Sequence, residues 1–228
     1  MQKHILFGII GLIAGLAIGF IGANSINRDT SLQTAAPVSQ PVIAAAANSS
    51  SVPQGGGTQA DVQQTLDRAA AEPKNFAVQM KTGDMYAQIG RFDKAIEFYK
   101  QGIVLKPDDF QANVVIANAY FDSGKYEDAE SFYSKALLIN PKDINTRTDL
   151  GTTFVERQNP DYDRALKEFR SALEVDPKNE PALYNLGITY FRKGDKDNAN
   201  KALADLEKTN AASPLIEKLR QNFSSGER

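Results

Sequence analysis

The chain has 228 residues, a formal net charge of −2, no cysteine and a single histidine, His4. Near-neutral charge without a basic stripe argues against a nucleic-acid partner, and the missing thiols exclude disulfides, thiolate metal sites and lipids attached through Cys. One histidine near the N-terminus leaves Ser-His-Asp triads and two-histidine metal sites without their imidazole. We therefore expect a non-enzymatic protein with no metal site and no cofactor.

After a short tail of residues 1–4, residues 5–23 form an uncharged apolar run, ILFGIIGLIAGLAIGFIGA. At a helical rise of about 1.5 Å per residue, this run would cover about 30 Å, the hydrocarbon thickness of a bilayer. It predicts a single transmembrane anchor, with the N-terminus in the cytoplasm and the rest of the chain outside. The alternative is a signal peptide cleaved near Ala23, which would release a secreted protein, although such apolar cores usually span only about 7–15 residues.

Glycines recur every three or four residues within this run, so they share one helix face: Gly8, Gly11, Gly15, Gly19 and Gly22. Small residues on one face let two helix backbones approach closely in lipid. The pattern predicts a homo-oligomer formed through Gly11, Gly15 and Gly19. The alternative is that these glycines only reflect the frequency of glycine in membrane helices.

Residues 24–58 follow as a linker rich in Pro, Gly, Ser, Ala and Gln, with no charge between Thr30 and Ala60. Such a segment has little apolar surface to bury, so we expect it to stay disordered. A flexible coil of this length has a root-mean-square span of about 30 Å. We interpret it as a tether.

From residue 59 onward, prolines recur at intervals of 34, 34 and 36 residues, at Pro73, Pro107, Pro141 and Pro177. The segments that follow them align in columns once two extra residues in the third segment are allowed for. The eighth column is small, the eleventh aromatic, the twentieth alanine and the twenty-fourth large and apolar. The eighth column contains Gly83, Ala117, Gly151 and Gly187, and the eleventh contains Tyr86, Tyr120, Phe154 and Tyr190. The twentieth contains Ala95, Ala129, Ala165 and Ala199, and the twenty-fourth contains Tyr99, Tyr133, Phe169 and Leu203.

Within each half of a segment, the apolar residues are spaced by three and four, as one face of a helix requires. Gly90, Gly124 and Gly194 can adopt the left-handed conformation that ends a first helix, and each proline ends a second helix. Asn75, Asp109, Asp143 and Asn179 are placed to cap the next helix. The segments therefore predict helical hairpins that bury their apolar faces against one another.

These columns resemble the tetratricopeptide repeat (TPR), over about residues 76–206. The resemblance implies an all-α superhelix of about four hairpins: residues 76–109, 110–143, 144–179 and a degenerate fourth at 180–212. Residues 59–72 and 213–223 are predicted to be capping helices. The family's frequent tryptophan at the fourth column is absent; Gln79, Asn113, Arg147 and Leu183 stand there.

The resemblance implies a concave groove that binds an extended peptide or a partner helix, lined mainly by the first helix of each hairpin. We expect Asn118 to contribute most, because an amide can hydrogen-bond a ligand backbone as donor and as acceptor. The groove columns contain Met80, Asp84, Gln88, Val114, Asn118, Phe121, Thr148, Thr152, Tyr184, Ile188, Phe191 and Arg192. The alternative for each of these residues is ordinary surface or packing between repeats.

An anchor, a tether and a short TPR stack together are similar to bacterial envelope TPR proteins, which implies a periplasmic scaffold for one protein partner. The columns lack the lysines of adaptors that bind a C-terminal carboxylate, and the missing Cys excludes acylated pilus-assembly lipoproteins. Two alternatives stay open. One is a structural, self-assembling membrane protein, and the other is an accessory subunit of an envelope enzyme or of a cytochrome c maturation complex.

Overall fold

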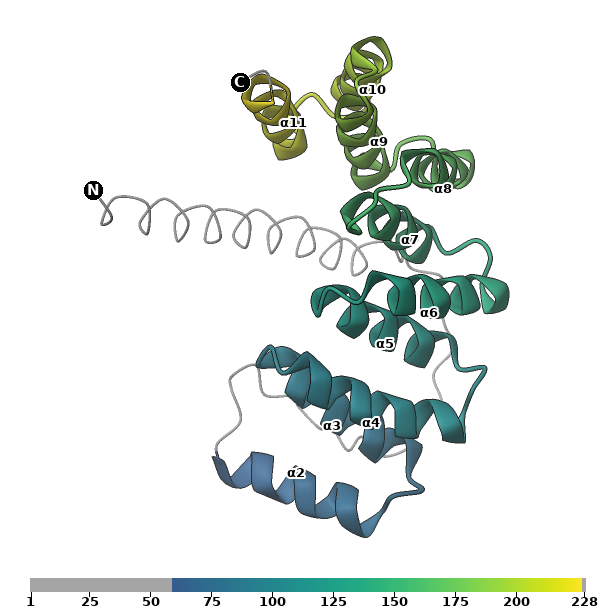
Figure 1. Ribbon diagram of the computed structural model, residues 1–228, viewed down its shortest axis with the longest axis vertical. Coiled ribbons are helices and arrows are strands. Elements are labelled where there is room, and N and C mark those ends of the chain that lie inside the picture. The colour runs from purple at the N-terminus through teal and green to yellow at the C-terminus, as the bar shows by residue number, and fades with distance from the viewer. Residues whose placement is uncertain (1–58, 227–228) are drawn as a thin grey trace, which may run out of the picture. The chain divides into compact units, whose positions relative to one another are not determined.

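The computed structural model describes residues 59–226, which belong to one compact unit (Figure 1). The predicted anchor, its glycine face and the linker lie outside the described residues. Within residues 59–226, no helix is long and apolar enough to cross a bilayer.

The described residues form ten helices and no strand, which confirms the predicted all-α class. Consecutive helices pair as α3 with α4, α5 with α6, α7 with α8 and α9 with α10, and each pair packs against the next (Figure 1). The bounds are α2 Gln59–Ala71, α3 Phe76–Gln88, α4 Phe92–Leu105, α5 Phe110–Asp122, α6 Tyr126–Ile139, α7 Ile144–Glu156, α8 Tyr162–Val175, α9 Glu180–Lys193, α10 Lys196–Thr209 and α11 Pro214–Ser225.

The first helix of every hairpin is capped by the side chain that the sequence predicts. Each cap accepts a hydrogen bond from a backbone N–H three residues on, which satisfies a donor that the helix itself leaves unpaired. The four distances are 3.3 Å for Asn75 with Val78, 2.9 Å for Asp109 with Ala112, 2.8 Å for Asp143 with Thr146 and 2.9 Å for Asn179 with Ala182.

Three of the four first helices end at a glycine with positive φ, which confirms the predicted left-handed turns. The φ angles are 72° at Gly90, 75° at Gly124 and 87° at Gly194. The longer third repeat has Arg157 instead, in an extended conformation, and its guanidinium donates to the Asn159 carbonyl at 2.9 Å and to the Asp161 carboxylate at 3.2 Å. These bonds organise the two extra residues of that turn.

Close packing of a glycine against an aromatic ring holds the first and third hairpins together. A Cβ atom placed on Gly151 would lie 2.5 Å from Cε1 of Phe169, and one placed on Gly83 would overlap the Tyr99 ring. Phe169 is completely buried. The small column is therefore a steric requirement of the hairpin, since a larger side chain would displace the ring.

Three of the four residues that replace the family's tryptophan connect a first helix to the turn before it or, for Gln79, also to the end of α2. The Gln79 amide donates to the carbonyls of Ala69 and Glu72 at 3.3 and 3.2 Å. Asn113 and Arg147 donate in the same way to Pro107 at 3.0 Å and Pro141 at 2.7 Å. In the fourth repeat, Leu183 is buried instead. Hydrogen bonds to turn carbonyls thus take the place of ring packing in the first three repeats.

Both ends of the described stack are closed by amphipathic helices. Helix α11 buries Leu215, Ile216 and Leu219 against the preceding hairpin, and its opposite side is polar and exposed: Glu217, Arg220, Gln221 and Ser224. At the other end, α2 buries Ala69 and exposes Gln63, Gln64, Asp67 and Arg68. Polar outer faces remove the apolar surface on which a further repeat would stack.

Candidate functional site

The first-helix face is the set of groove-column residues that the sequence predicts on α3, α5, α7 and α9. Helices α7 and α9 are in direct contact. The Asn185 amide donates to the Thr152 hydroxyl at 3.4 Å, and the Arg192 guanidinium pairs with Glu156 at 2.7 Å. In the third and fourth repeats, side chains about one repeat apart therefore lie next to each other.

The predicted residues differ in how far they are accessible to a partner. Asp84, Gln88 and Arg192 are exposed; Met80, Val114, Asn118, Thr152, Ile188 and Phe191 are half-buried; and Phe121, Thr148 and Tyr184 are buried. A buried side chain contributes to packing between helices and offers little area to a ligand. The accessible part of the face in the first two repeats therefore consists of Met80, Asp84, Gln88, Val114 and Asn118.

Two tyrosines orient the polar side chains of this accessible part. The Tyr99 hydroxyl donates to Oδ1 of Asp84 at 2.7 Å, and the Tyr133 hydroxyl donates to Oδ1 of Asn118 at 2.6 Å. Since this bond uses the Asn118 carbonyl oxygen, the amide presents mainly its Nδ2 donors to a partner, rather than both groups as the sequence suggests.

Sequence reasoning treated Tyr99 and Tyr133 as packing residues only, although the columns carry the signal. In the first two repeats, tyrosine at the twenty-fourth column accompanies a strong acceptor, Asp84 or Asn118, at the ninth. In the third repeat, Phe169 accompanies Thr152, whose hydroxyl donates to the Thr148 carbonyl at 2.9 Å in its own helix. The fourth repeat has Leu203 with Ile188. The tyrosine hydroxyl at the twenty-fourth column and the strong acceptor at the ninth column therefore occur in the same two repeats, and the other two repeats have neither.

Helix α11 covers part of the fourth repeat on this face. The Asn222 amide donates to the Tyr184 hydroxyl at 3.3 Å. Phe191 stacks on Phe223 with ring centroids 4.8 Å apart. In the structure, Tyr184 and Phe191 therefore pack against the closing helix.

Burial raises the pKa of the Tyr184 hydroxyl above its ordinary value, and outweighs the opposing effects of Arg192 and the Asn222 hydrogen bond. Because the folded-state pKa is the higher one, this residue stabilises the fold at pH values below about 10. That stabilisation is lost as the pH rises through the folded-state pKa. In an ultraviolet difference titration, we expect Tyr184→Phe to remove absorbance from the late-titrating part of the curve. An unchanged curve above the ordinary tyrosine pKa would contradict this expectation.

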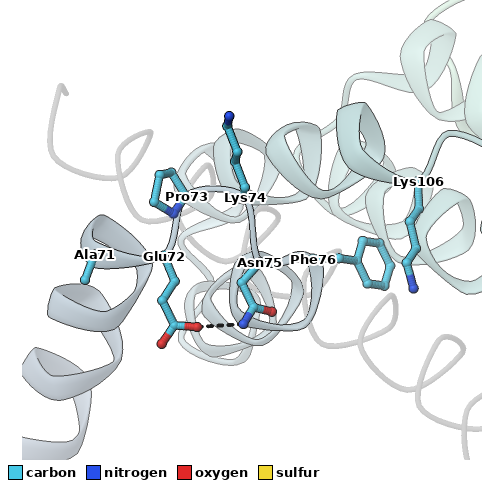
Figure 2. A pocket seen from close by; sticks show the side chains of 7 residues that line it. All are labelled: Ala71, Glu72, Pro73, Lys74, Asn75, Phe76 and Lys106. Carbon is cyan, nitrogen blue, oxygen red and sulfur yellow. Dashed lines mark hydrogen bonds between the residues drawn. The ribbon is translucent and has the colours of Figure 1, made fainter.

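A shallow pocket of about 680 Å³ lies at the turn between α2 and α3 (Figure 2), lined by Ala71, Glu72, Pro73, Lys74, Asn75, Phe76 and Lys106. Its polar groups are largely paired within the chain. The Asn75 amide donates to Glu72 at 2.6 Å, Arg68 donates to the same carboxylate at 2.8 Å, and the Lys106 ammonium lies 4.5 Å from the Phe76 ring centroid. The hydrogen bonds from Arg68 and Asn75 lower the pKa of the Glu72 carboxyl below its ordinary value. The pocket has no nucleophile–base pair, and no metal-binding cluster occurs among the described residues.

The repeat pattern is matched by known proteins. A family model described as tetratricopeptide repeat matches residues 86–148 and 156–223, and a second with the same description matches residues 59–110. No curated protein matches the chain.

Solved structures share the fold at low sequence identity. A crystal structure of MamA is 22% identical, with 66% of this chain and 86% of that chain aligned and a TM-score of 0.61. MamA from Desulfovibrio magneticus is 16% identical, with 68% of this chain and 87% of that chain aligned and a TM-score of 0.62. A thermophilic TPR protein of Thermus thermophilus is 20% identical, with 68% of this chain and 84% of that chain aligned and a TM-score of 0.56.

Proposed function

The chain belongs to the tetratricopeptide repeat family, and we propose that it is a non-enzymatic scaffold that holds a protein partner on its first-helix face. The observation that carries this proposal is the pair of tyrosine-oriented side chains, Asp84 and Asn118, beside Met80 and Val114. An extended peptide or a partner helix needs both apolar contact and hydrogen bonding, and this part of the face offers both.

The two oriented groups differ in chemistry, which would give a bound peptide a direction. The Asp84 carboxylate is an acceptor, while Asn118 directs its Nδ2 donors outward because Tyr133 uses its oxygen. A peptide backbone that crosses α3 and α5 could therefore donate to Asp84 and accept from Asn118. Side chains already held in place lose little conformational entropy on binding, so they strengthen the affinity.

We propose that this scaffold works next to a membrane. Residues 5–23 carry no charge and match the length of a membrane span, and residues 24–58 would let the repeat unit move about 30 Å from the bilayer surface. With the short basic N-terminus in the cytoplasm, the repeats would lie on the opposite side, in the periplasm of a bacterial cell.

The test is purification of the full chain in detergent, identification of the proteins retained with it, and measurement of their affinity. We expect Asp84→Ala and Asn118→Ala each to lower the affinity for the retained partner by roughly tenfold, because each substitution removes about one hydrogen bond to that partner. The matched control is Gln101→Ala together with Lys167→Ala, which are exposed on the second helices α4 and α8. If both first-helix variants bind the partner as tightly as the control does, the first-helix face is not the binding site.

Self-association is the competing role, and the polar end faces argue against stacking of the repeats. We therefore expect residues 56–228 to be monomeric in light scattering, and any homo-oligomer of the full chain to form through Gly11, Gly15 and Gly19. Detergent-resistant oligomers that survive substitution of these glycines by leucine would contradict that assignment.

A further inference from the structure

Two buried tyrosine hydroxyls bind the polar side chains of the first-helix face from inside their hairpins. Tyr99 on α4 and Tyr133 on α6 are each 2% exposed, so they offer almost no area to a partner. Their hydroxyls donate to Asp84 on α3 and to Asn118 on α5. The Tyr99 ring lies against the Gly83 backbone so closely that a Cβ atom there would overlap it, and this contact fixes the position of the hydroxyl.

A buried hydroxyl restricts which groups its acceptor can offer to a partner. Because an unpaired polar group in the interior is unfavourable, each tyrosine keeps its acceptor in one orientation. Asn118 has one carbonyl oxygen, which Tyr133 uses, so its Nδ2 hydrogens are the main groups left for a partner. Asp84 has two carboxylate oxygens, of which Tyr99 uses Oδ1, so Oδ2 remains as an acceptor.

The third and fourth repeats lack this arrangement. In the third, the completely buried Phe169 takes the place of the tyrosine. The Thr152 hydroxyl at the ninth column donates to the Thr148 carbonyl at 2.9 Å, so it is used within its own helix. The fourth repeat has Leu203 and Ile188 at these columns, and neither side chain can form a hydrogen bond. Among the four described repeats, the first two alone therefore present an oriented polar group at the ninth column.

We propose that Tyr99 and Tyr133 are positioning residues for partner binding, and that the ninth column recognises polar groups of the partner in the first two repeats only. Neither tyrosine touches the partner. Each acts through its acceptor, which it holds in the orientation that can hydrogen-bond to the partner, so that less conformational entropy is lost on binding. Along this column the partner meets a carboxylate on α3, an amide on α5 and the apolar, half-buried Ile188 on α9. The inference rests on the proposed function, because it names residues that control the same site.

The probe for the test is a peptide selected from a random phage-displayed library on the full chain in detergent, and fluorescence anisotropy measures its affinity for each variant. Tyr99→Phe and Tyr133→Phe each remove one hydroxyl. We expect each to lower the affinity roughly threefold to tenfold, because the acceptor is no longer held in place. The matched control is Tyr190→Phe, which removes the hydroxyl of another buried tyrosine, bonded to Arg170, and should leave the affinity unchanged.

Double variants separate positioning from a general loss of stability. If each tyrosine acts through its acceptor, Tyr99→Phe should cost no further affinity in an Asp84→Ala background. Tyr133→Phe should likewise cost none in an Asn118→Ala background. The crossed pair, Tyr99→Phe with Asn118→Ala, should lower the affinity by the product of the two single effects. Urea unfolding of every variant checks that the chain is folded under the binding conditions.

The outcomes distinguish this inference from the proposed function. A library that yields no peptide, or a peptide that binds Asp84→Ala and Asn118→Ala as tightly as the parent chain, contradicts the proposed function itself. The inference alone is overturned if those two variants bind more weakly while Tyr99→Phe and Tyr133→Phe bind as the parent does. It is also overturned if the tyrosine substitutions cost as much affinity in the alanine backgrounds as in the parent, because Tyr99 and Tyr133 would then act only by packing.

Discussion

Replacing Phe169 with alanine is expected to lower the free energy of unfolding of residues 56–228 by about 3–5 kcal/mol. The ring is completely buried, and it packs on the Gly151 backbone so closely that no Cβ fits between them. Its loss removes buried apolar area and leaves a cavity that the rigid helix pair cannot close. Urea unfolding followed by far-ultraviolet circular dichroism measures the change.

The matched control for Phe169→Ala is Leu138→Ala, which truncates a side chain that is 84% exposed. We expect Leu138→Ala to change the free energy of unfolding by less than about 0.5 kcal/mol. If the two substitutions cost the same, the small-against-aromatic contact does not hold the hairpin together.

Deletion of residues 211–228, which contain helix α11, is expected to destabilise the repeats by roughly 5 kcal/mol or more and to cause self-association. Helix α11 buries Leu215, Ile216 and Leu219, so its loss uncovers the apolar face of the last hairpin. Gly187 and Phe191 would then face water, since Leu219 and Phe223 cover them in the intact chain. Urea unfolding and light scattering of the truncated and intact chains measure both effects.

Gln221→Ala together with Ser224→Ala is the control for this truncation, because both residues lie on the exposed side of α11. We expect this double variant to remain monomeric and nearly as stable as the parent chain. A truncated chain that is also monomeric and stable would show that α11 is dispensable and that the fourth hairpin closes the stack by itself.

Features set by local chemistry could be predicted from the sequence. Asp143 caps α7 because a short acceptor side chain can reach the N–H groups of its own first turn, wherever the rest of the chain lies. Gly194 ends α9 with φ of 87° because this conformation strains any side chain, again a local constraint. The proline interval then gives the hairpin length, and recurrence of the interval gives the solenoid.

The candidate site could be predicted only in part. The groove columns identified Asp84 and Asn118, but not the tyrosines that orient them, because a hydroxyl fifteen residues away acquires its partner only when two helices close on each other. The columns also did not predict that Tyr184 and Phe191 pack against α11. Whether a side chain is buried depends on which helix packs over it, and the columns do not contain that information. The hydrogen bonds that Gln79, Asn113 and Arg147 donate in place of ring packing by the missing tryptophan could not be predicted either, since their acceptors are backbone carbonyls.

The sequence by itself determined the helices, their ends and their pairing into repeats, because capping, left-handed turns and helical periodicity act within a few residues. The tertiary structure alone decided which polar groups are held ready for a partner, which predicted groove residues are buried, and which aliphatic side chains remain in water. The physical reason is that burial and side-chain hydrogen bonds depend on distances between helices, and these exist only once the hairpins have packed.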